Sequence, residues 1–194
     1  TQSRGVVVGV AATLTAALLT ASPGAAQETT GYLTPPPEIV DILDAPPIPQ
    51  VVVSPRGDTV ALLSRPAMPS IAELAQPMLR LAGYRLNPRT NGPQRPAGIT
   101  RITLTGISDG AEHAFDAPRE TSLGPVNFSP DGSRLIFTLT RYNGIEVWLM
   151  EVATGDTRPL SDASINAAWG DPCDWLDENA TVICTFKAAA RGAP

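Results

Sequence analysis

The chain has 194 residues, which allows one domain or two. Its 14 basic and 19 acidic residues give a net charge of −5, and this argues against nucleic-acid partners, because nucleic-acid-binding proteins need a clustered basic surface. Twenty prolines are too many for a helix bundle and favour a loop-rich β protein. Because the chain begins with Thr1 instead of Met, we expect it to be a fragment.

Residues 1–27 have the features of a secretory signal peptide. Arg4 gives a weakly positive start, Val6–Leu19 is an apolar run, and Gly24–Ala26 offers small residues for cleavage after Ala26. A membrane anchor is the alternative, but the apolar run is shorter than the ~20 residues that a spanning helix needs. We therefore expect a periplasmic or secreted protein that has no membrane contact after cleavage.

Residues 28–48 form an N-terminal extension. Within it, Glu38–Asp44 carries apolar side chains at helical spacing. Three prolines precede this segment, where their missing N–H groups cost a helix nothing. The pattern predicts a short helix that ends before Pro46–Pro49.

A repeated strand–turn–strand pattern organises the rest of the chain. Phe128–Phe137 reads FSPDGSRLIF, Val53–Leu62 reads VSPRGDTVAL, and Trp175–Cys184, WLDENATVIC, is a degenerate third copy. The Pro and Gly residues suit a tight turn, and the apolar residues that follow alternate as in a strand. The copies begin 75 and 47 residues apart. The second spacing is close to the roughly 40–50-residue period of a propeller blade, and the first fits a blade with an insertion at residues 66–96.

The region around the second copy predicts the strands of one complete blade. Four strands are expected, at residues 126–128, 134–140, 145–152 and 157–160. Asn143-Gly144 is a hairpin turn signal, and Ile145–Val152 is apolar on both faces, which is typical of a sheet between two other sheets. The expected fold is all-β: a partial β-propeller of about three four-stranded blades over residues 49–194.

The insertion has local signals of its own. Ser70–Glu73 is a capping-box pattern and predicts a helical turn. Met78–Leu86 is apolar on mixed spacing, compatible with helix or strand. We favour strand, because Asn-Pro and Asn-Gly-Pro turn signals follow it.

Four segments carry a resemblance to a known family. Tyr32–Pro46, Met68–Pro77 and Leu79–Pro88 resemble the N-terminal region of the glutamyl endopeptidase branch of the prolyl oligopeptidase family, and Pro172–Leu176 fits the same branch. The Ser-Pro-Asp-Gly repeat alone also resembles Tol-type periplasmic propellers, so the insertion is the more specific signal. The resemblance covers roughly residues 30–190.

This resemblance implies an N-terminal propeller followed by an α/β-hydrolase domain with a Ser-Asp-His triad. The propeller narrows access, so that only peptides or unfolded segments reach the nucleophile. The chain would then be the propeller fragment of a secreted serine peptidase. Its peptide substrate would bind the missing hydrolase domain, no catalytic residue can be assigned within the chain, and no cofactor is implied. The alternative is a Tol-type periplasmic propeller that acts as a protein-binding module.

One motif imitates a catalytic site. Gly106–Gly110 fits the G-x-S-x-G nucleophile elbow around Ser108, which requires a strand before it and a helix after it. The following Ala111–Pro118 instead alternates like a strand, and the only histidine, His113, is too near in sequence for the base of a hydrolase. We therefore expect a plain hairpin turn at Ser108. His113 is expected to be an exposed strand residue with no metal cluster around it.

The only cysteines are Cys173 and Cys184. If the third repeat pairs Trp175 with Val182, the two cysteines lie directly opposite each other, with Cβ atoms ~4.5–5.5 Å apart. This separation is near what a disulfide needs, and an oxidising compartment would permit the bond. We predict a cross-strand disulfide, with two buried free thiols as the alternative.

Overall fold

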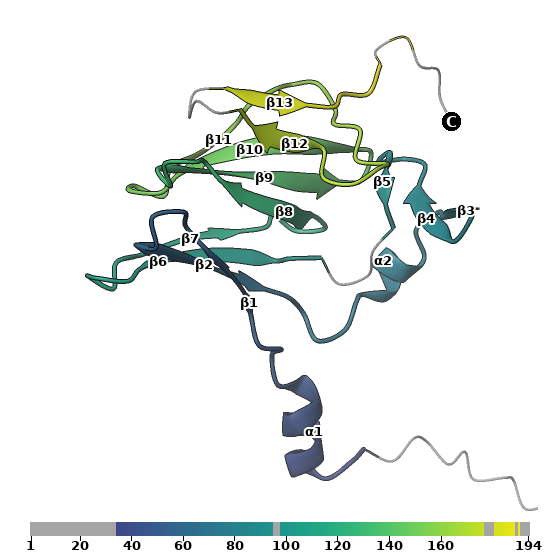
Figure 1. The fold of residues 1–194 in the computed structure, drawn as a ribbon. Helices are drawn as coiled ribbons and strands as arrows, with labels where there is room; N and C mark the ends of the chain where they lie inside the picture. The colour runs from purple at the N-terminus through teal and green to yellow at the C-terminus, as the bar shows by residue number, and fades with distance from the viewer. Residues whose placement is uncertain (1–33, 95–97, 177–180, 189, 191–194) are drawn as a thin grey trace, which may run out of the picture. The chain divides into compact units, whose positions relative to one another are not determined.

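The computed structural model describes residues 34–94, 98–176, 181–188 and 190, and most of its regular structure is β (Figure 1). The expected signal peptide, residues 1–27, lies outside the described residues. By its internal contacts the chain divides into two compact units, Thr1–Val40 and Asp41–Pro194. Helix α1 (Pro37–Asp44) is the helix predicted in the N-terminal extension, and all the strands of the structure belong to the second unit.

The first sheet contains four antiparallel strands in the order β1-β2-β6-β7. Its strands are β1 (Gln50–Val53), β2 (Thr59–Ser64), β6 (Arg101–Gly106) and β7 (Glu112–Asp116). The first copy of the repeat makes the β1–β2 hairpin, as predicted, with Val53 paired to Val60. Part of the chain between β2 and β6 folds as a separate small sheet, described below.

The second sheet has the order β11-β10-β9-β8 and is the complete blade expected from the sequence. Its strands are β8 (Ser122–Phe128), β9 (Arg134–Arg141), β10 (Gly144–Glu151) and β11 (Thr157–Pro159). A bulge interrupts the pairing of β8 with β9 between Leu123 and Val126. Pro125 lies in this bulge, where its lack of an N–H group does not remove a regular ladder bond.

The third copy of the repeat forms a two-stranded sheet of β12 (Cys173–Trp175) and β13 (Val182–Cys184). Its register pairs Trp175 with Val182 and Cys173 with Cys184, which is the register predicted from the sequence. Residues 177–180, which include the turn of this copy, lie outside the described residues.

The segment between β2 and β6 carries a three-stranded sheet in the order β3-β4-β5, which we call the insertion sheet. Its strands are β3 (Leu79–Leu81), β4 (Tyr84–Asn87) and β5 (Gly92–Pro93), and the short helix α2 (Ile71–Leu74) precedes them. The predicted helical turn is confirmed, and Ser70 is its N-cap, because the Ser70 hydroxyl accepts the N–H of Glu73 at 3.1 Å. The segment before the turn signals is β as favoured, but it forms a hairpin of β3 and β4 that turns at Ala82-Gly83 instead of a single strand.

Apolar side chains on both faces of the second sheet bind the three propeller-type sheets together. One face packs on the first sheet, through Ala61, Leu63, Ile102, Leu104, Leu135, Phe137, Leu139 and Met150. The opposite face packs on the third sheet and the segment before it, through Ile136, Ile145, Val147, Leu149, Ile165, Ala167 and Cys173. The prediction that the strand at 145–152 is buried on both sides is therefore confirmed, and Figure 1 shows the three sheets layered in this order.

Three aromatic rings reinforce the contact between the first and second sheets. Phe115 of β7 lies 5.1 Å from the ring centroid of Phe137 and 5.9 Å from that of Trp148. Aromatic pairs at these distances add about 0.5–1.5 kcal/mol each beyond the free energy of their burial.

In the described part of the chain, no helix has the length and apolarity required to cross a membrane.

Candidate functional site

The structure places the nucleophile-elbow sequence in a hairpin turn, as predicted. Ser108 lies between strands β6 and β7, and Gly106 donates its N–H to the carbonyl of Ala111 at 2.9 Å, which closes the turn. A strand follows the serine where a nucleophile elbow needs a helix N-terminus. The motif is therefore a coincidence of sequence and does not present an activated hydroxyl.

His113 lies on strand β7 as expected, but its exposure was predicted wrongly. The side chain is half-buried, because it packs against the β10–β11 turn of the second sheet. A Cβ atom added at Gly155 in this turn would stand only 2.8 Å from the Cβ of His113, so glycine permits the close approach. The side chain of His113 thus makes a packing contact between the first and second sheets.

Ser108 and His113 line one shallow hollow of about 300 Å³ between the first and second sheets. Asp58, Asp109 and Arg56 line it too. Within the described residues no hydrogen bond joins Ser108 to His113, and this bond is what a nucleophile and its base require. The carboxylates have other partners than His113: Asp109 accepts the N–H of Ala111, and Asp58 forms an ion pair with Arg56 at 2.9 Å. Nor do the described residues hold a cluster of metal ligands.

The serine of the Ser-Pro-x-Gly repeat closes each turn. Ser129 is fully buried, and its Oγ accepts the N–H of Arg134 at 3.0 Å while donating to Asp131 at 2.7 Å. Ser54 does the same in the first copy, where it accepts the N–H of Thr59 at 3.2 Å. Sequence reasoning assigned the turn to Pro, Asp and Gly and missed this serine, although its recurrence in two copies was a usable signal.

The Asp131 carboxylate is held in its charged form by this turn. The backbone N–H of Ser133 and the hydroxyls of Ser129 and Ser133 donate to it, and these bonds lower the pKa of Asp131 from its usual 3.8 to about 2. Arg56, from the equivalent turn of the first sheet, contributes a smaller electrostatic effect in the same direction. The two turns pack side by side, because a Cβ added at Gly132 would lie 3.5 Å from Nε of Arg56.

Cys173 and Cys184 are joined by a disulfide with an S–S distance of 2.04 Å. The two bonds on either side, from Thr185 to the Pro172 carbonyl and from Leu176 to the Thr181 carbonyl, show that the cysteines form a non-hydrogen-bonded pair. Side chains approach each other most closely in such pairs. The bond closes the β12–β13 hairpin at the edge of the apolar cluster between the second and third sheets.

Two further hydrogen bonds hold the disulfide hairpin on the second sheet. The indole Nε1 of Trp175 donates to the carbonyl of Asn127 at 3.1 Å, and the side-chain amide of Asn127 donates to the carbonyl of Cys173 at 3.4 Å. Strands β8 and β12 are therefore tied at the same point where the disulfide closes the hairpin.

The insertion sheet is fastened to the connection between the second and third sheets. The backbone carbonyl of Asn91 accepts the N–H of Ala167 at 3.1 Å. The side-chain amide nitrogen of Asn91 donates to the side-chain oxygen of Asn166. Gly92 comes so close that an added Cβ would stand 2.4 Å from Cδ1 of Ile145. The insertion thus reaches from the first sheet, past the second, to the start of the third.

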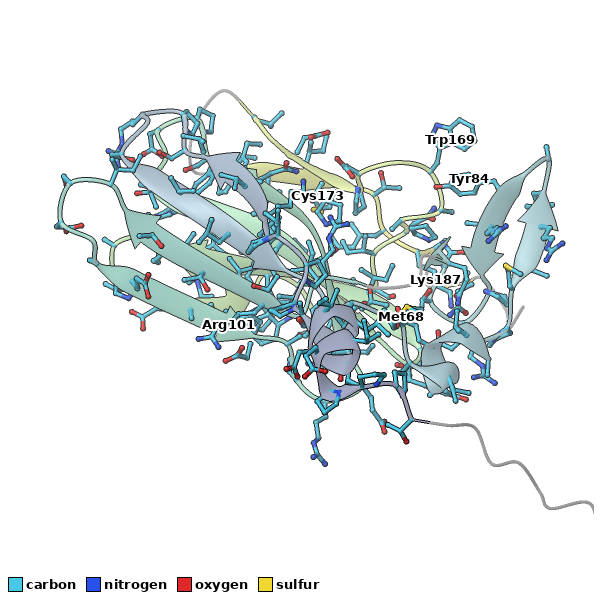
Figure 2. All side chains as sticks on the ribbon, turned by 90° about the horizontal axis from the view of Figure 1, so that it is seen from below. Met68, Tyr84, Arg101, Trp169, Cys173 and Lys187 are labelled. Atoms are coloured by element: carbon cyan, nitrogen blue, oxygen red, sulfur yellow. A yellow bond between two sulfur atoms is a disulfide. The ribbon has the colours of Figure 1, made fainter. Side chains whose placement is uncertain are left out.

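Two ring contacts extend this attachment. The Arg89 guanidinium lies 4.6 Å from the ring centroid of Tyr142 in the β9–β10 turn, a cation–π geometry. The ring centroids of Tyr84 and Trp169 are 6.1 Å apart with the rings tilted, and Figure 2 shows both side chains beside the insertion sheet. The insertion is therefore an integral part of the structure.

Known proteins of similar sequence identify the kind of protein to which this arrangement belongs. The chain is 35% identical over 178 residues to a probable glutamyl endopeptidase, chloroplastic, of Arabidopsis thaliana, covering 85% of the chain and 18% of that protein. It is 32% identical over 178 residues to the protein of the same name from Oryza sativa subsp. japonica, covering 84% of the chain and 19% of the relative. The chain thus spans less than a fifth of the length of these curated relatives.

Solved structures give weaker likenesses. An acylaminoacyl peptidase of Pyrococcus horikoshii matches 78% of the chain and 19% of its own length at 14% identity, with a TM-score of 0.46. TolB of Acinetobacter baumannii matches 61% of the chain and 22% of its own length at 17% identity, with a TM-score of 0.31. Both scores are too low to decide between these two proteins. No family model matches the chain.

The layered four-stranded sheets and the sequence relatives define the chain as a propeller-type region of a prolyl oligopeptidase family peptidase. The two relatives are named probable glutamyl endopeptidases, which is the branch that the resemblance of the N-terminal segments implied.

Replacing Asp131 with Asn should destabilise the protein at neutral pH, because the neutral amide cannot accept all the hydrogen bonds that the turn donates. The folded-state pKa of about 2 lies below the usual 3.8, so the stabilisation is present above about pH 4 and disappears as the pH falls towards 2. The difference in Tm between wild type and Asp131→Asn should therefore shrink over this range, measured by circular dichroism. Asp174→Asn, an exposed carboxylate on β12, is the control. An equal effect in both variants would contradict a specific role for the turn.

Removing the disulfide should lower the free energy of unfolding by about 3 kcal/mol, because the bond closes a loop between cysteines 11 residues apart and restricts the unfolded chain. Urea unfolding of the Cys173→Ser/Cys184→Ser variant measures this loss. Added reductant should destabilise the wild type and leave the variant unchanged. Alkylation of both thiols without reductant, seen by mass spectrometry, would show that the bond is absent in solution.

Proposed function

We propose that this chain is the leading part of the propeller of a secreted serine peptidase. In this proposal a hydrolase domain outside the 194 residues carries the Ser-Asp-His triad and hydrolyses the peptide bond. The observation that carries the proposal is the 35% identity to a probable glutamyl endopeptidase over 178 residues. The hairpin turn at Ser108 is consistent with it, since this serine is not presented as a nucleophile.

The role that we assign to the propeller is to restrict access to the catalytic domain. The second sheet is packed on both faces, and the insertion is hydrogen-bonded to the connection between the second and third sheets. A wall built in this way resists opening, so it would admit extended peptides and exclude folded proteins. The bound partner is then a peptide substrate, held mainly by the hydrolase domain. No nucleic acid and no cofactor enter this proposal.

We further propose export to the periplasm or to the exterior, with a signal peptide within residues 1–27 that is cleaved after Ala26, residues 28–48 as an extension and residues 49–194 as a partial propeller with the insertion at 66–96. The cross-strand disulfide supports this location, because such bonds persist in oxidising compartments. The relatives bear the word chloroplastic in their names, which describes those proteins.

The alternative is a Tol-type propeller that binds another protein and has no catalytic domain. The repeated turns fit both proposals, because many propellers share them. The identity to the glutamyl endopeptidases favours the peptidase.

A fluorophosphonate probe applied to the product of the complete gene distinguishes the two proposals. We expect labelling of a serine outside residues 1–194, and unchanged labelling in Ser108→Ala. Enzyme that has not been treated with the probe should cleave an extended peptide. It should not cleave the same sequence inside a folded domain. Loss of labelling in Ser108→Ala would place the nucleophile in this chain. A reading frame that ends as a closed propeller, without labelling, would support the binding module.

Export can be tested independently of activity. The mature protein should begin at Gln27, because Gly24–Ala26 supplies the small residues before the cleaved bond. Intact mass measurement of the protein from the periplasm or medium checks this, and Ala26→Leu should retain the leader. An uncleaved chain in the cytoplasmic fraction would contradict the proposed location.

A further inference from the structure

The hairpin of β3 and β4 in the insertion sheet carries two arginines at an unfavourable position. Arg80 and Arg85 are directly opposite each other in the register of the two strands, and both are exposed. Like charges directly opposite across a strand pair are destabilising. Among the described residues neither guanidinium has a carboxylate partner within ion-pair distance. A negatively charged group from outside the described residues would therefore be needed to neutralise this pair.

Backbone hydrogen bonds determine where the polar groups of Arg80 point. The carbonyl of Arg85 accepts the N–H of Gln94 at 2.9 Å, so the backbone groups of Arg85 face β5 and not β3. Arg80 and Arg85 are thus a non-hydrogen-bonded pair, and the N–H and C=O of Arg80 point to the opposite side of β3. Because β3 is the edge strand of the sheet, both groups are directed towards its free edge.

The two faces of the hairpin differ in chemistry. Alternation along the strands places Leu79 and Leu81 on the face opposite the arginines, and these side chains are 50% and 59% exposed. Tyr84, paired with Leu81, shares this apolar face and contacts Trp169. One side of the edge is therefore basic and the other is apolar.

The charge of the insertion contrasts with that of the chain. Residues 66–96 contain four arginines and a single acidic residue, Glu73, whereas the whole chain has a net charge of −5. A second copy of the chain pairing through its own β3 edge would bring further arginines to this position. Charge complementarity therefore favours an acidic partner over self-association.

We propose that the free edge of β3 is a docking site for an extended acidic peptide segment, which adds to the insertion sheet as a further antiparallel strand. The peptide residue opposite Arg80 would exchange two backbone hydrogen bonds with it, and its side chain would lie on the basic face. This residue is acidic, and its two neighbours are apolar and lie over Leu79 and Leu81. The recognised core is thus apolar–acidic–apolar. The site goes beyond the proposed function, and its occupation does not require peptidase activity.

Fluorescence anisotropy of the full chain with labelled nonapeptides tests this site. The three peptides share one sequence and carry at their centre Leu-Glu-Val, Leu-Gln-Val, or Leu-Glu-Val with an N-methylated glutamate. The glutamate peptide should bind about two- to fivefold more tightly than the glutamine peptide at low salt, the range of an exposed ion pair. The N-methylated peptide keeps its charge but cannot donate to the edge, so its binding should be lost.

Arginine variants locate the site on the chain. Arg80→Gln and Arg85→Gln should each remove most of the preference for glutamate and leave the Tm unchanged or slightly raised, since they relieve a like-charge pair. Arg158→Gln, an exposed arginine on strand β11, is the matched control and should bind like wild type. Hydrogen exchange of the Arg80 amide should slow when the glutamate peptide is bound.

Equal binding of the N-methylated peptide, or unchanged exchange at Arg80, would overturn strand addition. The same loss in Arg158→Gln as in Arg80→Gln would reduce the effect to general attraction by basic residues. Failure of all peptides to bind, with dimers seen by sedimentation, would assign the edge to a second copy of the chain. None of these results depends on whether the complete protein labels with a serine-directed probe.

Discussion

The structure depends on the burial of one sheet on both of its faces. Along β9, Leu135 and Phe137 face the first sheet while Ile136 faces the third, so alternate side chains of a single strand join two separate apolar clusters. Loss of a large side chain from such a position typically costs about 2–5 kcal/mol. Because the same strand supports two interfaces, its pairing register is fixed: a shift by one residue would exchange the two sets of side chains.

The hairpin turns keep this register and align the neighbouring sheets. In each full copy of the repeat a buried serine satisfies the backbone at the end of the turn, and a nearby carboxylate accepts from its hydroxyl. The carboxylate occupies different sequence positions, Asp58 in one copy and Asp131 in the other, yet bonds the same serine oxygen. The two turns therefore share a hydrogen-bond geometry although their sequences differ. The side chain of Arg56 packs against Gly132 and so links one turn to the next.

Much of this could be read from the sequence, because it depends on local periodicity. The alternation in Ile145–Val152 indicated burial on both faces, and the third repeat gave the register that opposes Cys173 and Cys184. The half-burial of His113 could not be read, since it follows from contact with Gly155, a residue of another sheet. The attachment of Asn91 to Asn166 was hidden for the same reason: two residues 75 positions apart meet only after the sheets have stacked.

The insertion shows how structure and recognition can be separated within one small element. Asn91 and Gly92, near its end, face the other sheets and are held by hydrogen bonds and close packing, so this part has little freedom to vary. Strand β3, at the other side of the same sheet, contributes exposed side chains throughout and is free to carry charges that weaken its own pairing. An opposed arginine pair is tolerated there because the rest of the insertion is anchored elsewhere. Stability and unneutralised charge thus coexist because the anchoring residues lie at and beside β5, whereas the two arginines lie on β3 and β4.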